Sequence, residues 1–177
     1  MKFDTGTELP DNFVLTKEFS DVYNLINDTN VNLFITGKAG SGKSTLLEYF
    51  RQNTNKNFVT LAFQGITAIK AKGQTLHSFF KFGPHFLAKE EIKLLKDKSL
   101  IQSLDTILID EISMVRADLF DAIDLSLKKN RKNNKPFGGV QMIVFGDVMQ
   151  IDPIVGSSDE EMMEKFYPKG RFFFNSN

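Results

Sequence analysis

Residues 31–50 read VNLFITGKAGSGKSTLLEYF. The stretch opens with apolar and β-branched residues, which are typical of a short buried strand. Residues 37–44 then fit the pattern G-x-x-x-x-G-K-[ST], and Leu46, Leu47 and Phe50 are spaced as one face of a helix. A strand, a glycine-rich loop and a helix in this order predict a phosphate-binding loop. The alternative is a chance match in a glycine-rich turn, and the two flanking elements argue against it.

The residue types of this loop suit a phosphate ligand. Glycine permits a close approach of the backbone, and the N–H groups of a helix N-terminus point at an anion that the helix dipole also favours. Lys43 can reach the β- and γ-phosphates of a nucleotide, and the Ser44 hydroxyl can ligate Mg²⁺. The predicted nucleotide-binding residues are Gly37, Ala39, Gly40, Ser41, Gly42, Lys43, Ser44 and Thr45.

The remaining chain alternates apolar strands with helical patterns. Strand-like runs lie at 58–63, 106–109 and 140–145, and helical spacing is found at 15–28 and 115–127. This alternation predicts an α/β fold of three layers, in which helices cover both faces of a parallel sheet. We expect residues 1–14 to form a loose lead-in and residues 15–177 to form one domain. The charged segment 88–103 has a helical period, which predicts a small helical insertion at about 85–104.

Composition excludes several classes of function. The 177 residues contain no cysteine, which rules out disulfides and thiolate metal sites. Lys and Arg together number 22, as do Asp and Glu, so the overall charge gives no sign of a nucleic-acid partner. The densest basic run, 128–135, is either a solvated helix end and loop or a local contact for nucleic acid. No apolar run is long enough to span a bilayer, and we expect no membrane partner.

Polar residues follow the ends of two predicted strands. Asp110 and Glu111 follow the strand at 106–109, and Gln150 follows the strand at 140–145. Because ligands of an open parallel sheet bind outside the carboxyl ends of its strands, these residues and the phosphate loop should share one crevice. There Asp110 can hold Mg²⁺, and Glu111 can deprotonate an attacking water if the chain turns at the strand end. Gln150 suits a group that senses the γ-phosphate, and a surface amide is the alternative.

His77 and Phe79 have two interpretations from their residue types alone. They are either core or internally satisfied residues, or they stack on and hydrogen-bond to a nucleic-acid strand. A metal role is not expected for His77, because no partner stands at ligand spacing.

Four blocks, in order, resemble the first motor domain (domain 1A) of a superfamily-1B DNA helicase of the PIF (petite integration frequency) type, which is RecD-like. This resemblance covers most of residues 31–155 and implies a RecA-like P-loop NTPase domain. The blocks are FITGKAGSGKSTLL (34–47) for motif I, GQTLHSFF (73–80) for a segment that contacts single strands, ILIDEISMV (107–115) for motif II and PFGGVQMIVFGDVMQ (136–150) for motif III.

The resemblance implies ATP and Mg²⁺ as cofactors and a role for each matching residue. Lys43 would bind the β- and γ-phosphates, and the metal residues would be Ser44, Asp110 and Glu111. Glu111 would be the general base, and Gln150 would couple the γ-phosphate to the DNA-bound conformation. The insertion would separate DNA strands. The single-strand track would comprise Gly65, Thr67, Thr75, His77, Ser78 and Phe79.

Such enzymes move 5′ to 3′ along single-stranded DNA and open forked duplexes in repair, replication, recombination or telomere maintenance. Two positions depart from the family pattern: Phe19 stands where a glutamine usually reads adenine, and Asp152 stands where motif III usually has proline. The chain ends at Asn177 without the C-terminal second motor domain and its arginine fingers, so we expect the isolated chain to be nearly inactive. A composition rich in Lys and Asn without a transit peptide favours a bacterial cytoplasm, at the nucleoid.

Two other classes remain open from the residues. A nucleotide kinase or an AAA-type ATPase would share the phosphate loop, but a kinase needs a second basic pocket, and the chain has few arginines to build one. A nucleotide-gated binding module would share the fold without catalysis. The available arginines are Arg51, Arg116, Arg131 and Arg171.

Overall fold

The computed structural model describes residue 9 and residues 13–177. Five parallel strands form one sheet in the order β1-β5-β4-β2-β3, which confirms the predicted α/β class. The strand at Gln74–Thr75 was not predicted, because it is only two residues long. The predicted lead-in at 1–14 lies almost entirely outside the described residues. The strands are β1 (Leu33–Thr36), β2 (Phe58–Ala62), β3 (Gln74–Thr75), β4 (Thr106–Asp110) and β5 (Gln141–Gly146).

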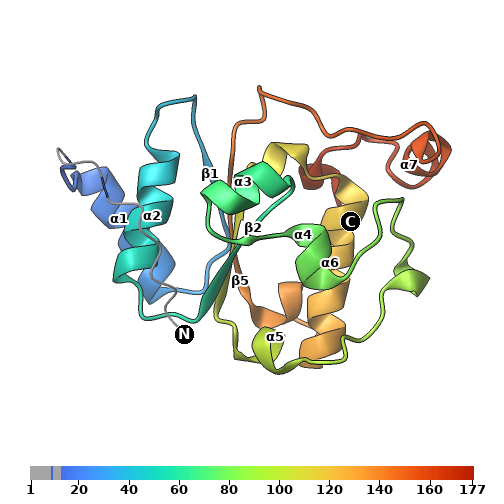
Figure 1. The fold of residues 1–177 in the computed structure, drawn as a ribbon, viewed down its shortest axis with the longest axis horizontal. Coiled ribbons are helices and arrows are strands. Elements are labelled where there is room, and N and C mark those ends of the chain that lie inside the picture. The colour runs from blue at the N-terminus through green and yellow to red at the C-terminus, as the bar shows by residue number, and fades with distance from the viewer. Residues whose placement is uncertain (1–8, 10–12) are drawn as a thin grey trace.

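Helices cover both faces of the sheet. Helices α1 and α2 lie on one side of it, and α4, α5 and α6 lie on the other (Figure 1). Each side has its own core, with Ile26 and Phe50 on the first and Leu76 and Ile123 on the second, all buried. The helices are α1 (Lys17–Asp28), α2 (Lys43–Asn53), α3 (Gly65–Lys70), α4 (Leu76–Phe80), α5 (Ser99–Ser103), α6 (Ala117–Arg131) and α7 (Glu160–Phe166).

The register of the strands brings their carboxyl ends to one edge of the sheet. Thr36 of β1 pairs with Gly146 of β5, while Ala62 of β2 pairs with both Asp110 of β4 and Thr75 of β3. The loops that follow all five strands therefore leave the sheet at the same edge. None of the helices in the described part of the chain combines the length and apolarity that crossing a membrane requires.

The insertion, residues 85–104, is mostly irregular, which corrects the expectation of a helical segment. Helix is confined to a 3-10 turn at Lys89–Glu91 and to α5. Side chains of α6 bind the backbone in between: Asn130 Oδ1 accepts from the Leu95 N–H at 2.9 Å, and Lys129 Nζ donates to the Ile92 carbonyl at 2.9 Å. Because these bonds satisfy the backbone, the segment packs its apolar residues on α6 without becoming a helix.

The last residues return to the start of α6. Phe172 forms an antiparallel bridge with Arg116, and the Ala117 N–H donates to the Arg171 carbonyl at 2.9 Å. Phe173 is buried in the core on the α6 side of the sheet. The C-terminal segment thus fixes the N-terminal end of α6.

Candidate nucleotide and nucleic-acid site

The phosphate loop, residues 37–44, connects β1 to α2 through left-handed backbone. Gly40 has a φ of 78° and Gly42 a φ of 87°, a region that residues with a Cβ rarely adopt. Gly42 is the N-cap of α2, so the first N–H groups of this helix are free of intrahelical partners at the loop. The loop therefore presents backbone donors and the positive end of a helix dipole at the edge where the strands end.

Lys43 lies at the first position of α2 and bends back over the loop. Its Nζ donates to the carbonyl of Gly37 and to that of Lys38, the latter at 3.1 Å. The ammonium group is thus held by backbone oxygens at the centre of the loop. Ser44 and Ser41 are exposed beside it, and Thr45 is half-buried.

The acidic pair, Asp110 and Glu111, lies at the end of β4. Glu111 adopts left-handed backbone, with φ 52° and ψ 49°, and its N–H donates to Asp110 Oδ1 at 2.9 Å. The chain therefore turns at the end of β4, between Asp110 and Glu111. This turn is what the two carboxylates need to take separate roles. A non-glycine residue in this conformation is uncommon and costs on the order of 1 kcal/mol, which marks the turn as a strained point beside the loop.

Burial raises the pKa of Asp110 above its ordinary value, while the Glu111 N–H and the charge of Lys43 act in the opposite direction. A carboxylate desolvated in this way is stabilised by a nearby cation. Glu111 is exposed and faces solvent at the same edge. The pair therefore combines one half-buried and one exposed carboxylate.

The residues at this edge fit a magnesium ion that is bound together with a nucleotide. Among the described residues, no cluster of three or more His, Asp or Glu side chains forms an all-protein metal cage. Magnesium usually keeps several waters and binds one or two carboxylates plus substrate phosphates. The exposed Ser44 hydroxyl and the half-buried carboxylate of Asp110 are donors of the kind that such an ion needs.

Gln150 follows β5 in a turn that Asp147 holds. Asp147 Oδ1 accepts from the Met149 N–H, and the Asp147 carbonyl accepts from the Gln150 N–H, each at 3.0 Å. The Gln150 side chain is exposed on the edge that carries the phosphate loop. Sequence reasoning did not select Asp147, although its place directly after a buried strand was a signal for it.

The residues predicted to contact a single strand follow β2 and β3. Gly65 and Thr67 lie in α3, and Thr75 caps α4 by accepting the Ser78 N–H at 3.2 Å. The Ser78 side chain is exposed. These four residues therefore lie on the segments that leave the carboxyl edge of the sheet next to the acidic pair.

The structure places His77 and Phe79 differently with respect to the two interpretations, a core residue or a contact to a nucleic-acid strand. The His77 ring is half-buried, with its ring centroid 5.6 Å from that of Phe63, and burial followed by the charge of Arg116 lowers its pKa. Phe79 is only 7% exposed in the core and packs edge-on against Phe80 at 4.9 Å. Phe79 is therefore mostly buried, which favours the core interpretation for this residue over a contact with a single strand.

A parallel sheet with a phosphate loop after β1 and an acidic pair after β4 defines a P-loop NTPase domain. Residues 14–167 match the family described as PIF1-like helicase. The chain therefore belongs to the PIF1-like helicases, which confirms the resemblance drawn from its motifs.

Similar proteins are longer than this chain. Over 152 residues it is 39% identical to the ATP-dependent DNA helicase Pif1 of Psychrobacter sp. (strain PRwf-1), an alignment that covers 78% of this chain and 22% of that protein. A structure of Bacteroides Pif1 with ADP-AlF3 and single-stranded DNA gives a TM-score of 0.85 at 40% identity, over 93% of this chain and 39% of that one. A structure of two coordinating Pif1 helicases concerns DNA unwinding at forked duplex DNA. It gives a TM-score of 0.86 at 41% identity, over 93% of this chain and 40% of that one.

Proposed function

We propose that this chain is the nucleotide-binding motor domain of an ATP-dependent DNA helicase that moves 5′ to 3′ along single-stranded DNA. The observation that carries the proposal is the meeting, at one edge of the sheet, of the phosphate loop, the acidic pair and the Gln150 turn. Membership of the PIF1-like helicases supports it, as do relatives bound to single-stranded DNA and an ATP analogue. We further propose that the enzyme acts in DNA repair, replication or recombination in a bacterial cytoplasm.

Each residue at this edge has a role that its chemistry supports. Lys43 and the loop N–H groups bind the β- and γ-phosphates of ATP. Ser44 and Asp110 hold Mg²⁺, which neutralises phosphate charge when it is bound. Glu111 accepts a proton from the attacking water, because its carboxylate is exposed at this edge. Gln150 orients toward the γ-phosphate and links it to the DNA-bound conformation.

DNA binds along the segments that follow β2 and β3. Gly65, Thr67, Thr75 and Ser78 offer backbone and hydroxyl groups to the phosphates and sugars of a single strand. His77 is neutral at pH 7 because its pKa is lowered, so it contributes a hydrogen bond rather than an ion pair. Forked DNA is the proposed substrate, in line with the relative described at a fork.

A second motor domain of the full-length protein is the proposed partner of this edge. Five large apolar side chains on the segments that follow β2 and β5 are more than half exposed, namely Ile66 (70%), Ile69 (77%), Met149 (89%), Ile151 (60%) and Ile154 (65%). Large exposed apolar side chains on the loops at one edge of a sheet suit a surface that another domain covers. Since an arginine finger from such a partner is worth about 10³–10⁵ in rate, the isolated residues 1–177 should hydrolyse ATP hardly at all.

Unwinding polarity tests the proposal. The full-length protein is mixed with ATP and a fluorescently labelled duplex that carries a single-stranded tail at either its 5′ or its 3′ end. We expect strand separation only on the 5′-tailed duplex. Separation on the 3′-tailed duplex alone would contradict the proposed direction. ATP turnover that does not respond to DNA, or phosphorylation of a nucleoside, would favour a different P-loop enzyme, and a protein without turnover would favour a nucleotide-gated binding module.

A further inference from the structure

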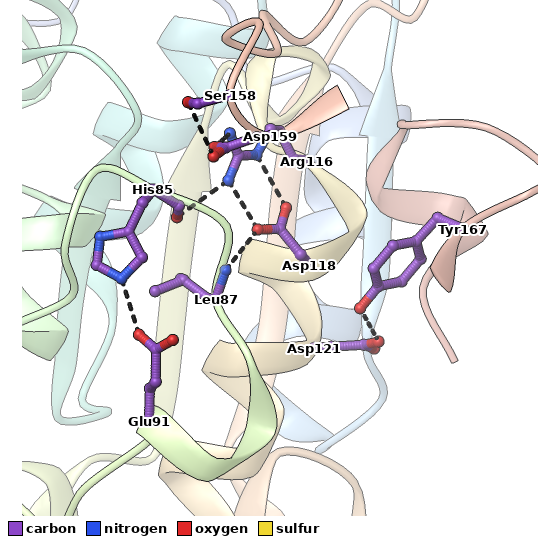
Figure 2. A network of polar contacts seen from close by, with 9 residues as sticks. All are labelled: His85, Leu87, Glu91, Arg116, Asp118, Asp121, Ser158, Asp159 and Tyr167. Atoms are coloured by element: carbon purple, nitrogen blue, oxygen red, sulfur yellow. Dashed lines mark hydrogen bonds and ion pairs between the residues drawn. The ribbon is translucent and has the colours of Figure 1, made fainter. Parts of the chain in front are cut away.

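Arg116 is a buried arginine that joins three separate segments of the chain. Its guanidinium donates to both carboxylate oxygens of Asp118, at 2.9 and 2.7 Å, and to Asp159 Oδ2 at 2.9 Å. Nη2 also donates to the His85 carbonyl at 3.1 Å (Figure 2). Arg116 is 8% exposed, Asp159 6% and Asp118 fully buried, so the whole cluster is shielded from water.

The partners of Arg116 extend the cluster to the insertion and to α7. Asp118 Oδ2 also accepts from the Leu87 N–H at 3.0 Å, which ties the first residues of the insertion to the start of α6. Asp159 is the N-cap of α7, so it ties the segment that follows Gln150 to the same guanidinium. A buried charge is costly when it loses a partner, and these segments are therefore held in one arrangement.

A short rigid connection links Arg116 to the acidic pair. Arg116 follows Glu111 by five residues. The residues between them form the 3-10 turn Ile112–Met114 and Val115, and each is no more than 3% exposed. Because close-packed interiors transmit displacements, a shift of the Glu111 backbone would act on Arg116 through these buried residues.

The same guanidinium borders the segment proposed to contact DNA. A cavity of about 260 Å³ is lined by Arg116 and His77, with Phe63 and Ile154 among its other walls. Arg116 is also the charge that lowers the pKa of His77 after burial itself. Arg116 thus stands between the acidic pair, the His77 segment and the segment that follows Gln150.

We propose that Arg116 is a positioning residue that couples the nucleotide at the acidic pair to the His77 segment, to the insertion and to the segment after Gln150. It acts through Asp118 on residues 85–87 and through Asp159 on the segment after Gln150. A planar guanidinium can bridge two carboxylates and a carbonyl at once, whereas a lysine ammonium cannot reproduce this fork. The proposal rests on the proposed function, because it concerns how DNA and ATP influence each other.

The test is the ratio of ATP turnover at saturating single-stranded DNA to turnover without DNA, measured on the full-length protein. We expect Arg116→Lys to lower this ratio about tenfold, within the usual range of coupling between two sites. The matched control is Arg131→Lys. Arg131 donates to the carbonyls of Gly138 at 3.0 Å and Leu104 at 3.1 Å, at the opposite end of the sheet, and its replacement should leave the ratio within about twofold.

Asp159→Asn keeps the Arg116–Asp118 pair and decides the outcome if Arg116→Lys does not fold. This variant should also lower the stimulation ratio. In the double variant Arg116→Lys/Asp159→Asn the ratio should be no lower than in Arg116→Lys alone, since both changes act on the same Arg116–Asp159 contact. Variants that melt at a lower temperature but keep the wild-type ratio would overturn the coupling role. A wild-type protein whose turnover DNA does not stimulate would instead overturn the proposed function.

Discussion

Ile112 packs directly against Gly146: a Cβ atom built on Gly146 would lie 2.8 Å from Ile112 Cγ2. Gly146 is the last residue of β5, and Ile112 begins the turn after the acidic pair. The missing side chain lets the loops that follow β4 and β5 touch. The acidic pair and the Gln150 turn therefore lie on two loops in mutual contact.

Gly146→Ala should destabilise the fold at this contact. The added methyl would meet the stiff Ile112 side chain and lie 3.3 Å from the Ile112 backbone nitrogen, so the turn must shift. Overpacking of this kind costs about 1–3 kcal/mol, and ATP turnover should fall as well because the acidic pair moves. Urea unfolding measures the loss. Gly156→Ala is the control, since its Cβ would meet only Ser158 Oγ at 3.8 Å. Equal stability of both variants would show that the contact has room to spare.

Glu111→Gln should abolish turnover while leaving nucleotide binding largely intact. The amide keeps the size of the side chain but cannot accept a proton from water, and loss of a general base costs about 10²–10⁴ in rate. Steady-state turnover and the affinity for a fluorescent ATP analogue are measured side by side. Glu90→Gln, which changes an exposed carboxylate of the insertion, serves as the control. Turnover that survives in Glu111→Gln would remove Glu111 from the proposed chemistry.

Asp110→Asn should stabilise the nucleotide-free protein at neutral pH. Because burial raises the pKa of Asp110, its contribution to folding stability is greatest at low pH and is lost as pH rises through the raised pKa. Asparagine keeps the acceptor for the Glu111 N–H without the charge. Urea unfolding should therefore show a gain over wild type at about pH 7 that shrinks toward about pH 4. Asp152→Asn, at an exposed position, should show no such trend. A gain independent of pH would mean that charge is not its cause.

The sequence predicted the elements with long, clear patterns and missed those that tertiary contacts determine. β4 and β5 are buried on both faces, so their apolar runs were visible. β3 contains only Gln74 and Thr75 and has no apolar run to detect. The conformation of the insertion depends on Asn130 and Lys129, which lie in a helix far along the chain.

The residues of the candidate site also fall into those that local sequence predicted and those that only the fold brings together. The phosphate loop and acidic pair could be predicted because local spacing carries their chemistry. The spacing of apolar residues could not tell that His77 is half-buried and Phe79 buried. Both flank Ser78, and both residue types suit either a core or a binding face. Arg116 and Asp159 are 43 residues apart, and only the fold brings them within 2.9 Å.

The measurement that tests most directly whether the protein is a DNA motor is ATP turnover with and without single-stranded DNA. It compares the full-length protein with its Lys43→Ala variant. The Lys43 ammonium donates only to loop carbonyls, so its removal should spare the fold while removing the phosphate contact. We predict that single-stranded DNA stimulates turnover of the wild-type protein and that turnover disappears in Lys43→Ala. Turnover that is indifferent to DNA, or that persists without Lys43, would contradict a DNA motor driven from this phosphate loop.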